Sequence, residues 1–352
     1  MSPPPLSAPE VPPALRLTCD GDALVANWRW LRTRGGGAAC GAAVKADGYG
    51  LGAREVAARL IRAGCRDLFV SSWGEAAALG DLPDGVALSV LHGVREEDVA
   101  YALASPARPV LNSPPQVARW KAAGGGACDA MIDTGMNRLG LRPEEAGCLK
   151  GVAIETLMSH LASADEADTA FASRQRDAFA AVAACVPARR ASLANSAGIC
   201  LGADYAFDLT RPGLALYGGV PRAEAGGAIQ PVMRIEAQVL QCRRVPAGET
   251  VGYGATWTAG GDAHVAILNI GYADGYLRGF SNAGRVFAGD RALPVVGRVS
   301  MDLLAVDATG TDVTEGDWLA LDPDLGAASA ASGLSQYELL TALGRRYQRR
   351  WT

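Results

Sequence analysis

Short apolar runs alternate with amphipathic stretches along the chain from about residue 20 to residue 218. The runs recur at intervals of about 20 to 35 residues, and the segments between them carry helical spacing. In residues 54–64, REVAARLIRAG, the apolar side chains share one helical face and Gly64 marks the end. The candidate strands are 40–45, 67–71, 86–91, 108–112, 128–133, 154–160, 190–195 and 213–218. Eight strands joined by helices predict an α/β fold, a (β/α)8 TIM barrel with the helices outside.

The pattern changes after about residue 228, where strands of mixed alternation are separated by Gly, Asp and Pro turns. The candidate strands there are 232–245, 264–270, 293–299, 302–307 and 317–322. Residues 221–231 have the small, polar and Pro/Gly composition of a linker. We therefore expect a disordered Pro-rich leader at 1–14, a barrel at 15–228 and a C-terminal mostly-β domain at 229–352.

Composition narrows the class of protein. The net charge of the 352 residues is 33 − 37 = −4, which gives no basic surface for nucleic acid or anionic membrane. The longest apolar run, 178–186, is far shorter than the about 20 residues that span a membrane. The N-terminus lacks the basic and apolar regions of a secretory signal, and the eight cysteines and three histidines show no metal-site spacing. We expect a cytoplasmic protein without a metal.

Cationic and polar residues fall at the expected carboxyl ends of the barrel strands, where such barrels form their active sites. These residues are Lys45, Arg138, His160, Asn195, Ser196 and Arg211. The set suits an anionic, phosphate-bearing cofactor. Lys45 ends an apolar strand, so burial would lower the pKa of its amine and favour Schiff-base formation. The alternative is an ordinary surface lysine at a strand end.

Nine segments in this order resemble alanine racemases, which depend on pyridoxal 5'-phosphate (PLP). The match runs over essentially the whole chain after residue 14. The segments are AAVKADGYGLGA, IDTGMNRLG, MSHLASAD, LANSAG, RPGLALYGG, VGYGATW, IGYADGYLR, VGRVSMDLLAVD and YELLTALGRRY.

The resemblance implies interconversion of L- and D-alanine through a PLP external aldimine, with D-alanine supplied for peptidoglycan. Lys45 would hold PLP and act as the base on one face of the substrate, and Tyr253 would act on the other. Inversion needs a proton removed on one side and returned on the opposite side, so two groups are required. Both ordinary pKa values lie near 10 and must move toward neutrality. Without the resemblance, Tyr253 would be read as a strand aromatic packed at a domain seam.

The resemblance also assigns the cofactor and substrate contacts. Arg211 would face the pyridine nitrogen and keep it unprotonated, because arginine does not release its proton. Arg138 would meet the substrate carboxylate and the phenolic oxygen. His160 would lie against the ring. The phosphate would be held by Tyr49, Asn195, Ser196, Gly213, Leu214 and Tyr347. Simpler readings remain for single residues: an ion pair for Arg211, a core histidine for His160, a helix cap for Ser196.

The family's active sites straddle a dimer interface, so the resemblance implies a homodimer with shared sites. The second domain would supply Tyr253, Tyr272, Met301 and Asp302 to the partner's site, with the Met301 N–H on the substrate carboxylate. Met301 alone would pass for a core methionine.

Three positions depart from the family's pattern. Met131 stands where a Lys or Asn commonly helps to orient Arg138, and Ser192 stands where a His often supports Arg211. We expect the support of Arg211 to differ, with a water between the groups. In the C-terminal segment, the tyrosine that often contacts phosphate is either Tyr347 or replaced by Arg345.

Other functions stay open at this stage. They are a PLP racemase for another small amino acid such as serine, a barrel-type decarboxylase, a PLP-binding protein without catalysis and a lysine Schiff-base aldolase. Arg211 argues against the decarboxylase, because decarboxylases of this fold pair the ring nitrogen with a carboxylate. The Ser196 and Gly213 cradle argues against an aldolase whose substrate carries no phosphate.

Overall fold

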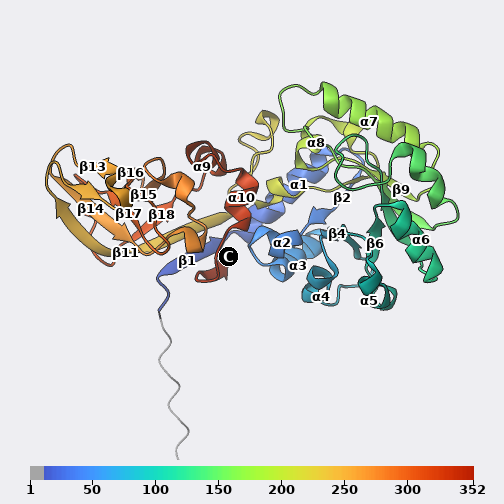
Figure 1. The fold of residues 1–352 in the computed structure, drawn as a ribbon, viewed down its shortest axis with the longest axis horizontal. Helices are drawn as coiled ribbons and strands as arrows, with labels where there is room; N and C mark the ends of the chain where they lie inside the picture. The colour runs from blue at the N-terminus through green and yellow to red at the C-terminus, as the bar shows by residue number, and fades with distance from the viewer. Residues whose placement is uncertain (1–11) are drawn as a thin grey trace, which may run out of the picture. The chain divides into compact units, whose positions relative to one another are not determined.

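The computed structural model describes residues 12–352, which form two compact units (Figure 1). The barrel unit spans Asp20–Val232, and the β unit combines Leu15–Cys19 with Met233–Thr352. Most of the leader expected at 1–14 lies outside the described residues.

A parallel sheet closes into a barrel in the first unit. Seven strands follow one another in chain order from β3 to β9, and β10 pairs with β2. The backbone N–H of Asp208 donates to Ala191 in β9 and that of Gly41 donates to Thr210 in β10, so β10 joins the two ends of the sheet. The predicted α/β barrel is confirmed. Its strands are β2 (Ala39–Cys40), β3 (Ala42–Ala43), β4 (Asp67–Val70), β5 (Ala87–Val90), β6 (Arg108–Leu111), β7 (Cys128–Met131), β8 (Ile154–Met158), β9 (Arg190–Ser192) and β10 (Leu209–Thr210).

The eighth strand was predicted in the wrong place. Residues 213–218 form the 3-10 helix η4 (Leu214–Tyr217), and the eighth strand is β10, just before it. Pro212 has no N–H to offer a ladder, and the Ser196 hydroxyl accepts the N–H groups of Gly213 and Ala215. All four η4 residues are buried, and a short buried run has the same composition in a strand and in a helix.

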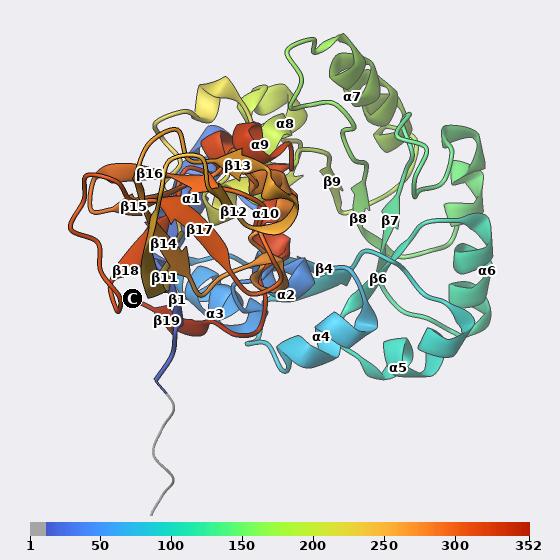
Figure 2. The same ribbon diagram turned by 60° about the vertical axis from the view of Figure 1, so that its left-hand side comes forward.

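Helices cover the outside of the barrel, as Figure 2 shows for α4 to α7. As predicted, α3 (Ala53–Ala63) buries Val56, Ala57 and Leu60 and ends at Gly64, whose φ of 111° suits only glycine. No helix among residues 12–352 is long and apolar enough to cross a membrane. The other helices of this unit are α1 (Gly21–Arg34), α2 (Lys45–Tyr49), α4 (Trp73–Leu79), α5 (Val99–Ala104), α6 (Pro114–Ala122), α7 (Ala170–Ala183), α8 (Ser196–Cys200), η1 (Glu96–Asp98), η2 (Pro143–Leu149), η3 (Ala203–Tyr205) and η5 (Ala223–Ala225).

The barrel interior is layered along the strands. At their amino ends lies a charged layer, here called the floor, in which Asp129 accepts from Ser89 (2.6 Å) and Arg108 (3.3 Å). Arg190 pairs with Asp67 there at 2.6 Å. An apolar layer, the waist, follows toward the carboxyl ends. The waist consists of Phe69, Val110, Met131, Met158 and Leu209. Water is therefore kept from the barrel axis between the two ends.

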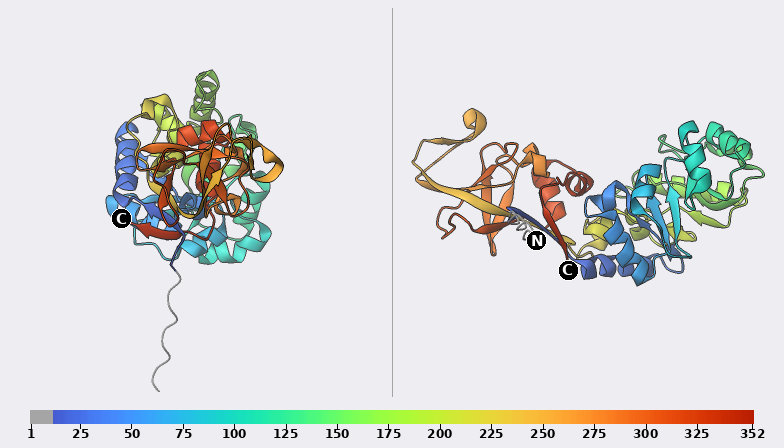
Figure 3. Two further views of the ribbon diagram at one scale, coloured as in Figure 1. Left: turned by 90° about the vertical axis from the view of Figure 1, so that its left-hand side faces the viewer. Right: turned by 90° about the horizontal axis from the view of Figure 1, so that it is seen from below.

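The second unit is a largely antiparallel sheet that closes on itself. Its order is β14-β17-β16-β15-β18-β11, and β11 also pairs with β14. The long strand β11 (Met233–Val245) runs through this unit (Figure 3). It makes the closure with a register shift between Val239 and Gln241. The other strands are β12 (Thr250–Val251), β13 (Trp257–Thr258), β14 (Ala263–Leu268), β15 (Arg285–Ala288), β16 (Arg291–Val296), β17 (Leu304–Asp307) and β18 (Trp318–Leu321).

The second unit is mostly β-structure, as predicted, but the domain of its first strand differs from the sequence expectation. β1 (Leu15–Cys19), expected at the start of the barrel domain, pairs with β11 and with β19 (Gln348–Trp351). Its alternating apolar residues would suit either domain, and only the distant partner decides. Helices also lie among the strands of this unit. They are α9 (Leu325–Ser332), α10 (Gln336–Thr341), η6 (Tyr253–Ala255), η7 (Tyr272–Asp274) and η8 (Arg278–Phe280).

Candidate active site

The cationic residues predicted at the strand ends gather at the carboxyl end of the barrel, here called the mouth. Lys45 follows β3, His160 follows β8 and Arg211 follows β10. The charges of Lys45, Arg138 and Arg211 all act on the imidazole of His160, which brings the four groups into one neighbourhood. The structure therefore brings together four of the residues that the sequence analysis singled out.

Lys45 begins a turn of unusual hand. The three non-glycine residues Ala46, Asp47 and Tyr49 have φ angles of 52°, 52° and 55°, with Gly48 at 62° between them. Left-handed helical backbone costs non-glycine residues about 1–2 kcal/mol each. Backbone strain of this kind collects at functional sites, where the surrounding structure holds it in place.

Burial and neighbouring cations set the protonation of the mouth. Burial, together with the charge of Arg138, lowers the pKa of Lys45, and the carboxylate of Glu75 opposes this. Burial and the charges of Arg211 and Arg138 lower the pKa of His160 to about 3, so its ring is neutral. Lys45 is thus closer to the neutral amine that a carbonyl-bearing cofactor requires.

Arg211 is buried without a carboxylate partner. Its guanidinium donates to the Ser192 hydroxyl, to the Ser159 carbonyl (2.5 Å) and to the Leu193 carbonyl (3.5 Å). The expected support through water is wrong, because the Ser192 hydroxyl accepts directly from Arg211 and donates its own hydrogen bond to the Leu209 carbonyl. Burial lowers the pKa of Arg211 to about 10, so it remains a cation at neutral pH. A buried cation with only neutral acceptors favours an anionic or electron-rich ligand.

No ion pair joins Lys45, Arg138 or Arg211 to a carboxylate within residues 12–352. The same residues hold no group of three or more His, Cys, Asp or Glu side chains placed for a metal ion. The mouth therefore carries excess positive charge, which suits a phosphate and a substrate carboxylate.

The residues expected at the phosphate, apart from Tyr347, come together near Arg211. The Ser196 hydroxyl accepts from the N–H groups of Gly213 (3.0 Å) and Ala215 (3.2 Å). A Cβ at position 213 would lie 2.2 Å from the Tyr49 hydroxyl, so only glycine admits this approach. Asn195 caps α8 through the Gly198 N–H. Two hydroxyls thus meet close-lying backbone N–H groups beside the cations, and this donor set fits PLP.

Tyr253, Tyr272 and Met301 lie on the β unit. Their exposed fractions are 73%, 38% and 53%, unusually high for apolar and aromatic side chains. The N–H of Tyr272 donates to the Ser300 carbonyl and that of Ala273 donates to the Met301 carbonyl, both at 3.0 Å, so the two loops are joined. Each of the three side chains is therefore exposed on the β unit, where large apolar and aromatic groups are seldom left in water without a partner.

Arg346 ties the same two loops together. Its guanidinium donates to both carboxylate oxygens of the buried Asp274 (2.6 Å each) and to Asp302 (2.7 Å). The buried Tyr347 hydroxyl donates to the Asp274 carbonyl at 2.8 Å. Because this hydrogen bond takes the Tyr347 hydroxyl proton, Tyr347 is not among the residues proposed to hold the phosphate.

Met131 lies in the waist, with 8% of its surface exposed. Its thioether packs with apolar side chains and gives Arg138 no polar support. Arg138 is exposed and has no hydrogen bond to another described residue. The Arg138 guanidinium is therefore available to an anionic ligand.

Sequence reasoning missed Glu75, Ser159 and Arg346. Ser159 acts through its backbone carbonyl, which any residue type would supply. Glu75 had one available signal, the Ser72-x-x-Glu75 spacing that marks a helix start. Arg346 had none, since its partners lie 72 and 44 residues away.

Comparisons with known proteins agree over most of the chain. The model of the alanine racemase N-terminal domain matches residues 19–221, and that of the C-terminal domain matches 232–351. The alanine racemase of Acidiphilium cryptum is 41% identical, with 95% of this chain and 97% of that protein covered. The alanine racemase of Rhodospirillum rubrum is 43% identical, with 95% of this chain and 95% of that protein covered.

Solved structures show the same similarity. The crystal structure of alanine racemase from Bartonella henselae, with covalently bound pyridoxal phosphate, superposes with a TM-score of 0.91. It is 37% identical, with 97% of this chain and 100% of that chain covered. The crystal structure of biosynthetic alanine racemase from Pseudomonas aeruginosa gives a TM-score of 0.90 at 32% identity, with 97% of this chain and 99% of that chain covered.

Proposed function

Because this chain belongs to the alanine racemase family, we propose that Lys45 and Tyr253 move the Cα proton of alanine on opposite faces of the substrate. The chain shares the family's reaction, interconversion of L- and D-alanine, and its cofactor, PLP. As is typical of the family, the D-alanine serves peptidoglycan. What needs assignment is which residue performs each task.

When bound, PLP withdraws electrons from Cα and so acidifies the Cα–H bond. Lys45 attaches the cofactor, and its Nζ then exchanges the proton on one face. The lowered pKa of Lys45 supports this, because it increases the fraction of neutral amine that is available to attach the cofactor and to take a proton. The Tyr253 hydroxyl exchanges the proton on the other face. A single group cannot invert Cα efficiently, since it reaches only one face.

Arg211 and Arg138 bind different groups of the cofactor and substrate. Arg211 remains protonated and donates only, so it faces the cofactor nitrogen without giving it a proton. Arg138 takes the substrate carboxylate and the phenolic oxygen, in line with its lack of a protein partner. Tyr49, Ser196 and the N–H groups of Gly213 and Leu214 hold the phosphate, with Asn195 beside them, and His160 lies against the ring as a neutral group.

The second half of the site comes from a partner subunit in a homodimer. The exposed Tyr253, Tyr272 and Met301 support this, because monomeric proteins seldom present such side chains together to water. The Met301 N–H meets the substrate carboxylate, and Arg346 holds Asp302 beside it. The location is cytoplasmic, in line with free thiols at all eight cysteines.

The observation that carries this assignment is the buried, unpaired Arg211 among the other cations of the mouth. The test is D-alanine formation from L-alanine by the PLP-loaded protein, with L-serine in parallel. Tyr253→Phe should lose activity by about 10²–10⁴-fold and keep the absorbance band of the bound cofactor at about 420 nm. The control Tyr101→Phe alters a tyrosine that is also exposed and should change nothing. An active Tyr253→Phe would overturn the two-group assignment.

A further inference from the structure

The left-handed turn after Lys45 connects the proposed attachment lysine to the proposed phosphate ligand Tyr49. Backbone hydrogen bonds run along it from Gly48 to Val44 and from Gly50 to Ala46, both 2.9 Å. Because the turn is short, its hand fixes the directions in which both side chains leave the backbone.

These internal bonds leave the Ala46 N–H without a backbone acceptor. The side chain of Glu75 accepts its hydrogen bond instead. The Glu75 Oε1 accepts from the Ala46 N–H at 2.8 Å, and Oε2 accepts from the Ser71 N–H at 2.6 Å. One carboxylate therefore bridges the turn and the end of β4. Both bonds are charge-assisted, the stronger class of protein hydrogen bond.

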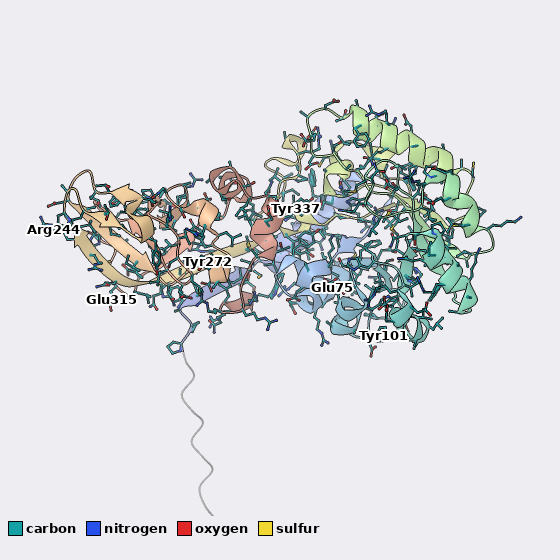
Figure 4. All side chains as sticks on the ribbon, in the orientation of Figure 1. Glu75, Tyr101, Arg244, Tyr272, Glu315 and Tyr337 are labelled. Carbon is teal, nitrogen blue, oxygen red and sulfur yellow. The ribbon has the colours of Figure 1, made fainter. Side chains whose placement is uncertain are left out.

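The Glu75 side chain does not make the capping-box hydrogen bond that its position predicts. It stands three residues after Ser72, the N-cap of α4, whose hydroxyl accepts from the Glu75 N–H at 3.3 Å. In a capping box the Glu side chain would return to the N-cap N–H. Here it reaches the preceding residue and across to the turn; Figure 4 marks its place on α4 in the barrel unit.

We propose that Glu75 is a positioning residue: its bridge from β4 to the Ala46 N–H holds the left-handed turn and so aims Lys45 and Tyr49 at the cofactor. The inference rests on the proposed function, because it takes Lys45 as the attachment point. It explains how a turn with three strained non-glycine residues is kept in one conformation.

The test compares Glu75→Gln with Ser72→Ala in the full chain. Glutamine keeps one acceptor oxygen and turns an N–H₂ group toward a donor. Ser72→Ala removes the cap of the same helix and leaves the carboxylate in place. Two quantities are measured: the PLP concentration that half-saturates borohydride-trapped label at Lys45, by peptide mass, and the visible circular dichroism of the bound cofactor, which reports its orientation.

Glu75→Gln should raise the half-saturating concentration by about tenfold or more and change the dichroism. Ser72→Ala should lower the melting temperature and move neither quantity. Glu75→Asp, one methylene shorter, keeps the charge but cannot reach both N–H groups, so it should lie between wild type and Glu75→Gln. It also serves if the glutamine variant fails to fold.

If wild type is labelled at Lys45 and both Glu75 variants match Ser72→Ala, the positioning role is wrong and the proposed function stands. If wild-type label lies on another lysine, both are wrong.

Discussion

The two ends of the barrel both bury charged side chains, but in opposite ways. On the floor, Asp129 and Asp67 each meet an arginine and the charges cancel. At the mouth, Arg211 donates only to neutral oxygens. Lys45 forms no ion pair with another described residue, although the carboxylate of Glu75 acts on it against the charge of Arg138. The apolar waist separates the two layers. Paired buried charges are typical of structure, whereas unpaired ones of a single sign indicate a place for a ligand of the opposite sign.

Removing the attachment amine should give the largest effect. Lys45→Ala should lose about 10⁴-fold or more of the racemase activity, about 5.5 kcal/mol, because attachment and one proton transfer disappear together. D-alanine formation and borohydride labelling measure it, with the exposed Lys150→Ala as control. A labelled and active Lys45→Ala would contradict the assignment of the mouth.

Breaking a floor pair should come next, and should act on stability. Asp129→Ala leaves Arg108 and the Ser89 hydroxyl without their partner. The free energy of unfolding, measured in urea, should therefore fall by about 3–5 kcal/mol. The control Glu55→Ala removes a helix-surface pair that is partly exposed to solvent, and it should cost under about 1 kcal/mol. Equal losses in the two variants would show that the floor charges are not buried as described.

A smaller effect of opposite sign is expected at the mouth. Burial lowers the pKa of Lys45 in the folded state, so its stability contribution is present above the ordinary value of 10.5 and lost as pH falls through the folded pKa. Lys45→Met without PLP should therefore melt higher than wild type at pH 7, and the gain should shrink toward pH 10.5. A variant that melts lower at pH 7 would mean that the lysine charge is compensated.

The waist should respond least. Met131→Leu conserves volume and should cost under about 1.5 kcal/mol of stability with KM for alanine unchanged. Melting curves and steady-state kinetics measure this. A raised KM with normal stability would mean that the Met131 thioether helps to orient Arg138.

The comparison also shows what a sequence can reveal. Lys45 and His160 were predictable because each lies within two residues of the end of a buried strand, and strand order alone brings such ends together. Arg211 follows β10, a strand that the sequence pattern did not locate. The positions of β10 and β1 were not predictable, because a buried apolar run does not distinguish strand from helix and pairing with a distant strand leaves no local mark. Glu75 and Arg346 escaped for the same reason, since they join segments 29 and 72 residues apart.

The central claim is that the mouth of one subunit is completed by Tyr253 of another. Lys45→Ala and Tyr253→Phe chains, each inactive as a homodimer, can be co-expressed with two affinity tags and isolated as the mixed dimer. One of its two sites then contains both Lys45 and Tyr253, so the mixed dimer should recover about half of the wild-type activity. If it stays as inactive as its parents, both residues act within one chain and the shared site is wrong.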